Sequence, residues 1–107
     1  MSAIATAPKR LVLPPDVQAF AQERGLTPYL AGILDVLHHV LADATTVTVE
    51  LNDDPEDPGL RCILFEAEVP WSKEQRRIAV KEWHRATAAI CPAPLHPTFC
   101  LITYRRP

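Results

Sequence analysis

Two histidines and two cysteines in the last quarter of the sequence are the side chains best suited to metal chemistry. They are His84, Cys91, His96 and Cys100. Two imidazoles and two thiolates are the donor set of a tetrahedral zinc site. Their separations of six, four and three intervening residues include no close CxxC pair, and cysteine is often buried without a metal. These four residues are therefore candidate ligands, but the spacing favours no metal site and we expect no cofactor.

A run of carboxylates is the second candidate site. It consists of Asp53, Asp54, Glu56 and Asp57. Oxygen-rich loops bind calcium, but an EF-hand needs its own ligand spacing and a central glycine, and neither is present here. Pro55 and Pro58 also limit how far the carboxylates can converge. The pattern favours a solvated loop, and its functional alternative is contact with the basic surface of a protein partner.

A basic cluster is the third candidate. Its members are Lys73, Arg76, Arg77, Lys81 and Arg85, which Arg61, Arg105 and Arg106 could extend. Such a surface can contact phosphates. However, Glu74 and Glu82 interrupt the run, and no glycine-rich loop or base-stacking aromatic pattern accompanies it. The cluster is typical of a solvated helix face, with protein contact and then nucleic-acid binding as the functional alternatives.

Catalytic motifs are absent from the sequence. There is no G-x-S-x-G or HExxH pattern, and of the two serines Ser2 is close to the N-terminus while Ser72 has the position of a helix cap. His39 lies four residues from both Asp35 and Asp43, an arrangement that on one helix face is typical of local hydrogen bonding. We therefore predict no catalytic residue and expect a protein that is not an enzyme.

The length and composition indicate what kind of domain positions these residues. A chain of 107 residues that is 48% hydrophobic and 22% charged suits one folded domain, and no apolar run reaches membrane-spanning length. No secretory signal is visible at the N-terminus. Three cysteines cannot all pair within one chain, which favours a reducing, cytoplasmic setting without membrane contact. We expect residues 1–12 to be a flexible segment and residues 13–107 to form the domain.

Three helices are predicted from capping signals and apolar periodicity. A short helix lies between Pro14 and Gly25, and a longer one begins at the Thr27 cap and carries apolar residues to Leu41 at three- and four-residue spacing. Ser72 and Gln75 have the spacing of a capping box for a third helix that ends near Ile90. Trp83 lies on the buried stripe of that helix, and Trp71 precedes it as a hydrophobic staple or an interface anchor.

Three strands are predicted from two-residue alternation. They run over residues 45–51, 62–69 and 99–104; the first two form an antiparallel hairpin whose turn covers residues 52–59, and proline-rich non-helical chain precedes the third. The order α-α-β-β-α-β predicts an α+β two-layer sandwich with strand order 2-1-3 and helices on one face. On the uncovered face we expect Leu64, Ile102 and Tyr104 to interrupt a polar surface with an apolar patch.

The formal net charge of -2 hides a strong asymmetry. Residues 1–57 contain nine acidic and three basic residues (3 − 9 = -6), whereas residues 58–107 contain four acidic and eight basic residues (8 − 4 = +4). Either the two sets lie together in the fold and neutralise each other, or they face apart and give the protein two oppositely charged surfaces. The sequence leaves both arrangements open.

Three stretches give the chain an overall resemblance to a known group of proteins. They are DVQAFAQERGLTPYL, VTVELNDDPEDPG and KEWHRATAAICPAPL. In this order they resemble a family of small uncharacterised bacterial proteins over residues 13–104. The resemblance implies a compact stand-alone domain. It transfers no activity and no catalytic residue.

The function that these features predict is a non-enzymatic protein-interaction or regulatory domain, for example one component of a two-protein bacterial module. It would act through a protein partner or self-association, using Trp71, the basic cluster and the carboxylate run as contact residues. Nucleic-acid binding through the basic third helix is the alternative. A small zinc-dependent enzyme that uses His84, Cys91, His96 and Cys100 is the third hypothesis.

Overall fold

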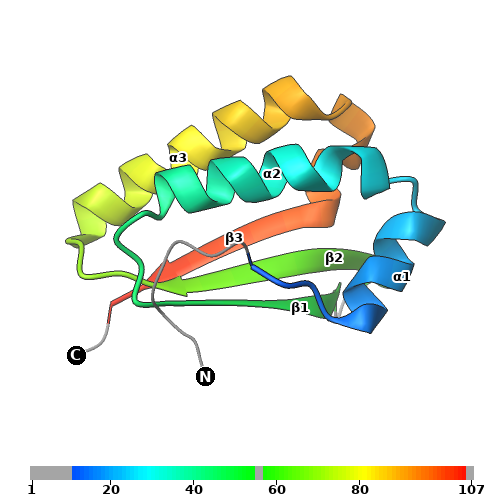
Figure 1. Ribbon diagram of the computed structural model, residues 1–107, viewed down its shortest axis with the longest axis horizontal. Coiled ribbons are helices and arrows are strands. Elements are labelled where there is room, and N and C mark those ends of the chain that lie inside the picture. The colour runs from blue at the N-terminus through cyan, green and yellow to red at the C-terminus, as the bar shows by residue number, and fades with distance from the viewer. Residues whose placement is uncertain (1–10, 55–56, 106–107) are drawn as a thin grey trace.

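The computed structural model describes residues 11–54 and 57–105 as a layer of helices on a three-stranded sheet (Figure 1). The elements in chain order are α1 (Pro15–Glu23), α2 (Thr27–Val40), β1 (Thr46–Asp54), β2 (Asp57–Glu68), α3 (Lys73–Ile90), the 3-10 helix η2 (Ala93–Thr98) and β3 (Phe99–Tyr104). The predicted α+β class and the order of the main elements are confirmed. Within the described residues, no helix combines the length and apolar character needed to cross a membrane.

The predicted strand order 2-1-3 is wrong, because the sheet has the order β1-β2-β3 with β2 in the middle. β2 is antiparallel to β1 and parallel to β3. The α3 crossover thus returns the chain to the free side of β2 instead of to β1. The sequence agrees with this position: residues 62–65 read Cys-Ile-Leu-Phe, an uninterrupted apolar run suited to a central strand, whose side chains are flanked by a neighbouring strand on each side.

One face of the sheet is covered and the other is open. Figure 1 shows α2 and α3 side by side over the same face, with α1 at one end of the sheet. Ile63, Phe65 and Ala67 of β2 point to this helical layer and are fully buried. α2 and α3 approach closely at Gly32, where an added Cβ would lie 3.4 Å from the Ile90 side chain.

Trp83 of α3 lies at the centre of the core. Its ring is fully buried and meets the Phe65 ring edge-on, with centroids 6.2 Å apart and an interplanar angle of 72°. Trp83 Nε1 and Thr87 Oγ1, one helical turn apart, are buried and have no hydrogen-bond partner within residues 11–54 and 57–105. The buried stripe predicted for this helix is therefore correct in its centre, with Thr87 as an additional polar member.

The ends of the helices follow the sequence signals in two of three cases. Ser72 and Gln75 form the predicted reciprocal capping box at the start of α3. Gly25, which follows α1, has the positive φ of 71° that glycine adopts without strain. Thr27, in contrast, is the first residue of α2 and makes no capping hydrogen bond, because the N-cap position is occupied by Leu26.

Two connections differ from their predictions. Strands β1 and β2 continue to Asp54 and from Asp57, into the segment predicted as a turn, with a register shift between Asp53 and Asp54. The proline-rich segment before β3 forms η2 instead of non-helical chain. A 3-10 turn tolerates these prolines because few of its N–H groups need to donate within the helix.

The start of the described chain is anchored to α2. The Leu11 backbone N–H donates to His38 Nε2 at 2.9 Å, and the Leu11 side chain packs against the core. Of the predicted flexible segment 1–12, residues 1–10 lie outside the described residues.

The capping box gives a test of the start of α3. We expect Ser72→Ala to lower the free energy of unfolding by about 1 kcal/mol, because one N-terminal N–H loses its acceptor. For a domain of this size that corresponds to a melting temperature lower by about 4–8 °C. The matched control is Thr27→Ala, whose hydroxyl caps nothing; an equal loss for both variants would contradict the assignment. Thermal unfolding followed by circular dichroism measures both.

Candidate functional site

The four candidate zinc ligands do not come together as a set, although Cys91 and His96 are neighbours. His84 is exposed on α3, whereas Cys91 is buried at the end of α3 with its Sγ donating to the Thr87 carbonyl at 3.7 Å. His96 in η2 donates from Nε2 to the Cys91 carbonyl at 2.7 Å, and Cys100 lies on β3. Among residues 11–54 and 57–105, no group of three His, Cys, Asp or Glu residues is arranged to hold a metal ion. The structure therefore does not assemble the zinc site.

The described members of the carboxylate run lie where β1 ends and β2 begins. Asp53 forms an exposed ion pair with Arg61 across the hairpin, with Arg61 Nε 2.6 Å from Asp53 Oδ1. Asp54 and Asp57 are paired in register at the hairpin end, and Glu56 lies outside the described residues. One member of the acidic set is thus engaged within the domain.

The basic cluster lies along α3, but its members have different surroundings. Lys73, Arg77, Lys81 and Arg85 are exposed. Arg77 pairs with Glu74 on the same helix, with Arg77 Nη2 2.5 Å from Glu74 Oε1. Arg76 is half-buried and donates from Nη1 to the Thr103 carbonyl of β3 at 3.5 Å, while its Nε is buried without a partner in the described chain. Arg76 therefore belongs to the edge of the sheet and the others to the helix surface.

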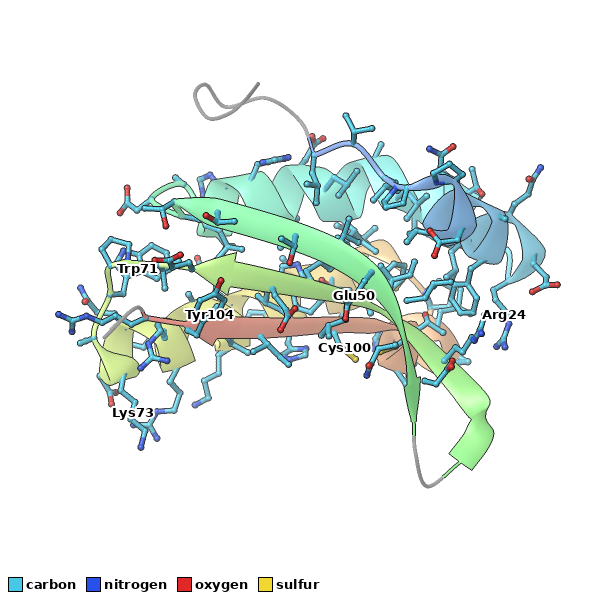
Figure 2. All side chains as sticks on the ribbon, turned by 90° about the horizontal axis from the view of Figure 1, so that it is seen from below. Arg24, Glu50, Trp71, Lys73, Cys100 and Tyr104 are labelled. Atoms are coloured by element: carbon cyan, nitrogen blue, oxygen red, sulfur yellow. The ribbon has the colours of Figure 1, made fainter. Side chains whose placement is uncertain are left out.

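Trp71 connects two loops of the domain. Its Nε1 donates to Asp43 Oδ2 at 3.2 Å, and its half-buried ring packs against the core. The hydrogen bond links the segment before β1 to the segment before α3. Figure 2 places Trp71 near one end of the sheet, where it serves as an internal contact.

The open face of the sheet carries an apolar strip, which we define as Leu64, Cys100, Ile102 and Tyr104. Leu64 of β2 is paired with Cys100 of β3, and the next two same-face positions of β3 are Ile102 and Tyr104. Leu64 is only 7% exposed because it lies on the central strand, whereas Ile102 is 49% and Tyr104 42% exposed. Figure 2, seen from this side, shows Cys100 and Tyr104 along β3. The predicted apolar patch is confirmed.

Three carboxylates border the apolar strip on the same face. Glu50 is opposite Leu64 in the β1–β2 register, and Glu66 and Glu68 occupy the β2 positions beside Ile102 and Tyr104. The basic side chains of α3 belong to the opposite layer of the sandwich. The carboxylates beside the apolar strip and the basic side chains of α3 thus lie on different layers of the sandwich. The acidic and basic halves of the sequence are not separated in this way, because Glu66 and Glu68 belong to the basic half and Arg61 of that half pairs with Asp53 of the acidic half.

Comparison of this chain with protein-family models, with curated proteins and with solved structures finds no match. The function therefore has to be inferred from the geometry of the open face and of α3.

The thiols of Cys91 and Cys100, which form no disulfide within the described residues, provide a chemical test of their different burial. Burial raises the pKa of the Cys91 thiol, whereas Cys100 on the open face is half-buried. Because the thiolate is the nucleophile, we expect iodoacetamide to label Cys100 faster than Cys91 in the folded protein at neutral pH. Peptide mass spectrometry measures both sites, with labelling in denaturant as the control. Equal labelling of the two sites in the folded protein is the contrary result.

The raised pKa of Cys91 also predicts the sign of a pH dependence. Cys91 is neutral in the folded state at a pH where it has begun to ionise in the unfolded state. Its contribution to stability is therefore complete below the ordinary thiol pKa of about 8.5 and is lost as pH rises through the folded-state pKa. Chemical denaturation between pH 7 and 10 should show this decline, and Cys91→Ala should make it shallower.

Proposed function

We propose that the chain is a non-enzymatic protein-interaction domain that binds a protein partner through the apolar strip of the open sheet face. The observation that carries this proposal is the exposure of Ile102 and Tyr104 next to each other on a face that no described helix covers. A three-stranded sheet normally buries apolar positions against another layer, and β3 places two of them in solvent. A protein partner is the layer that would cover them.

The composition of the open face agrees with a protein interface. Interfaces combine an apolar centre, in which tyrosine is enriched, with a polar rim. Here Leu64 and Ile102 supply the aliphatic centre and Tyr104 the aromatic anchor. Glu50 and Glu66 supply a charged rim that favours a partner with basic groups at matching positions.

The cellular setting that we propose follows from the thiols. Cys62, Cys91 and Cys100 form no disulfide within the described residues, as expected in a reducing compartment. We therefore keep the cytoplasm as the proposed location and a two-protein module as the proposed context. The zinc-enzyme hypothesis loses its support, because its four ligands do not converge.

Substitution of the apolar strip tests the proposed function. We expect the double variant Ile102→Lys, Tyr104→Ser to weaken partner binding at least tenfold, because it places a charge in the centre of the interface. The partner is first retrieved by co-purification from the source organism, then purified and titrated against the wild type and the variant by calorimetry. The control is Ile78→Lys: Ile78 is 56% exposed but lies on α3, away from the open face.

Comparison of the double variant with the control distinguishes loss of the interface from general destabilisation. Loss of binding in both variants would indicate general destabilisation, which melting curves would reveal. Unchanged binding in the double variant would overturn the role of the strip. Light scattering of the purified domain shows whether the partner is a second copy of the chain.

Nucleic-acid binding remains the second candidate because of one observation on α3. Lys73, Lys81 and Arg85 are exposed and form no ion pair with another described residue. This hypothesis expects duplex DNA or RNA to bind at low salt, with an affinity that falls steeply as salt is added. The variant Lys81→Glu, Arg85→Glu should abolish such binding while leaving partner binding through the strip intact.

A further inference from the structure

We propose that the outer edge of β3 binds an extended peptide segment as a fourth strand, and that this segment alternates acidic and apolar residues. The inference rests on the proposed function and deepens it, since it gives the chemistry of the partner and the way in which the partner adds to the sheet. Three observations carry it: the free backbone groups of β3, the basic flank of α3 and the exposed apolar side chains on the open face.

The backbone of β3 forms sheet hydrogen bonds along one side only, the side that faces β2. In the described chain β3 pairs with β2 alone, and the Val69 N–H donates to the Tyr104 carbonyl at 2.9 Å. The Tyr104 backbone therefore faces β2, and alternate residues of the strand face outward. These outward residues are Phe99, Leu101 and Thr103. Edge strands with such groups are templates for a further strand.

Most of the outward groups lack a partner within residues 11–54 and 57–105. The Phe99 N–H donates to the His96 carbonyl, and the Thr103 carbonyl accepts from Arg76. No hydrogen bond is made by the Leu101 N–H, the Leu101 carbonyl or the Thr103 N–H outside the sheet ladder. An added strand can bond to these three groups without breaking any contact between β2 and β3.

The helical layer beside this edge is basic. Arg76 reaches Thr103, which places the first turns of α3 over the edge of β3. Ile90 packs toward Gly32, so its flank of α3 faces α2. With 3.6 residues per turn, Lys73 and Arg77 lie on the opposite flank, which faces the edge. Figure 2 shows Lys73 at this end of α3. The buried Nε of Arg76 adds an unused donor at the same place.

The two sides of an added strand would meet different surroundings, and this determines its sequence pattern. Side chains of a strand alternate between the two faces of a sheet. Those on the helical side would lie near Lys73, Arg76 and Arg77, which favours Asp or Glu. Those on the open side would lie beside Ile102 and Tyr104, which favours apolar residues. The occupant that fits both sides is therefore an acidic–apolar alternating segment.

The experiment measures the binding of a fluorescein-labelled decapeptide of alternating Glu and Val to the full chain by fluorescence anisotropy. The control peptide has the same composition with all Glu residues before all Val residues. We expect the alternating peptide to bind at least tenfold more tightly than the control. Amide hydrogen exchange should slow at Leu101 and Thr103 when the peptide is added, because an added strand bonds to those groups.

Two variants separate strand addition from general attraction of charge. Thr103→Pro removes an outward N–H and leaves the ladder to β2 intact, so it should weaken peptide binding at least tenfold. Lys73→Glu, Arg77→Glu removes the basic flank and should have the same effect. The charge-matched control is Lys81→Glu, Arg85→Glu on the outward side of α3, which should stay within about twofold of the wild type by the distance dependence of screened charges. Melting curves check that each variant is folded.

Every other outcome overturns the inference. Equal binding of the two peptides, or equal losses in the two double variants, would show non-specific electrostatic attraction. Tighter binding of duplex DNA that Lys73→Glu, Arg77→Glu abolishes would assign the flank to nucleic acid. A dimer in light scattering that Thr103→Pro dissociates would assign the edge to a second copy of the chain. If the peptide fails but Ile102→Lys, Tyr104→Ser still weakens the purified partner, the proposed function stands and this inference does not.

Discussion

The contact between Trp83 and Phe65 holds the two layers of this domain together. It joins the middle of α3 to the middle of β2 through two fully buried rings, so the crossover helix is fixed to the central strand. A helix held there returns the chain to the side of β2 that β1 does not occupy, and β3 pairs at that position. The uncovered face and the free edge of β3 are consequences of this arrangement, because the two long helices α2 and α3 both lie on the other face.

Local signals in the sequence were sufficient to locate the helices and strands, but they did not determine which strands are adjacent in the sheet. Apolar periodicity located α2, and the Ser72–Gln75 box located the start of α3, because both depend on residues within one or two turns. The position of β3 depends on how the whole of α3 packs, and in the sequence it is reflected only indirectly, by the apolar run of residues 62–65 in the central strand β2. Thr27 shows a smaller version of the same limit: it has the correct residue type for a cap, but the chain turns one residue earlier.

The features of the candidate site also fall into those that local sequence patterns predict and those that depend on tertiary packing. The apolar patch could be predicted because two-residue alternation alone places Leu64, Ile102 and Tyr104 on a single face once the strands pair. The zinc set could not be evaluated from spacing, since it spans α3, η2 and β3, whose relative placement is tertiary. The role of Arg76 at the edge of β3 was missed for that reason too: in the sequence it is one cation among five, and only the fold shows that it covers the Thr103 carbonyl.

The two tryptophans have contrasting surroundings, so intrinsic tryptophan fluorescence can follow the core and the loops of this protein separately. Trp83 is enclosed by apolar side chains, and within residues 11–54 and 57–105 its indole N–H has no partner; Trp71 is half-buried and bonded to a carboxylate. We therefore expect Trp83 in the core to emit at shorter wavelength than Trp71 at the loop contact with Asp43. Changes in the emission of Trp71 without changes in that of Trp83 would reveal movement near the start of α3 while the packed layers stay closed, with no label attached.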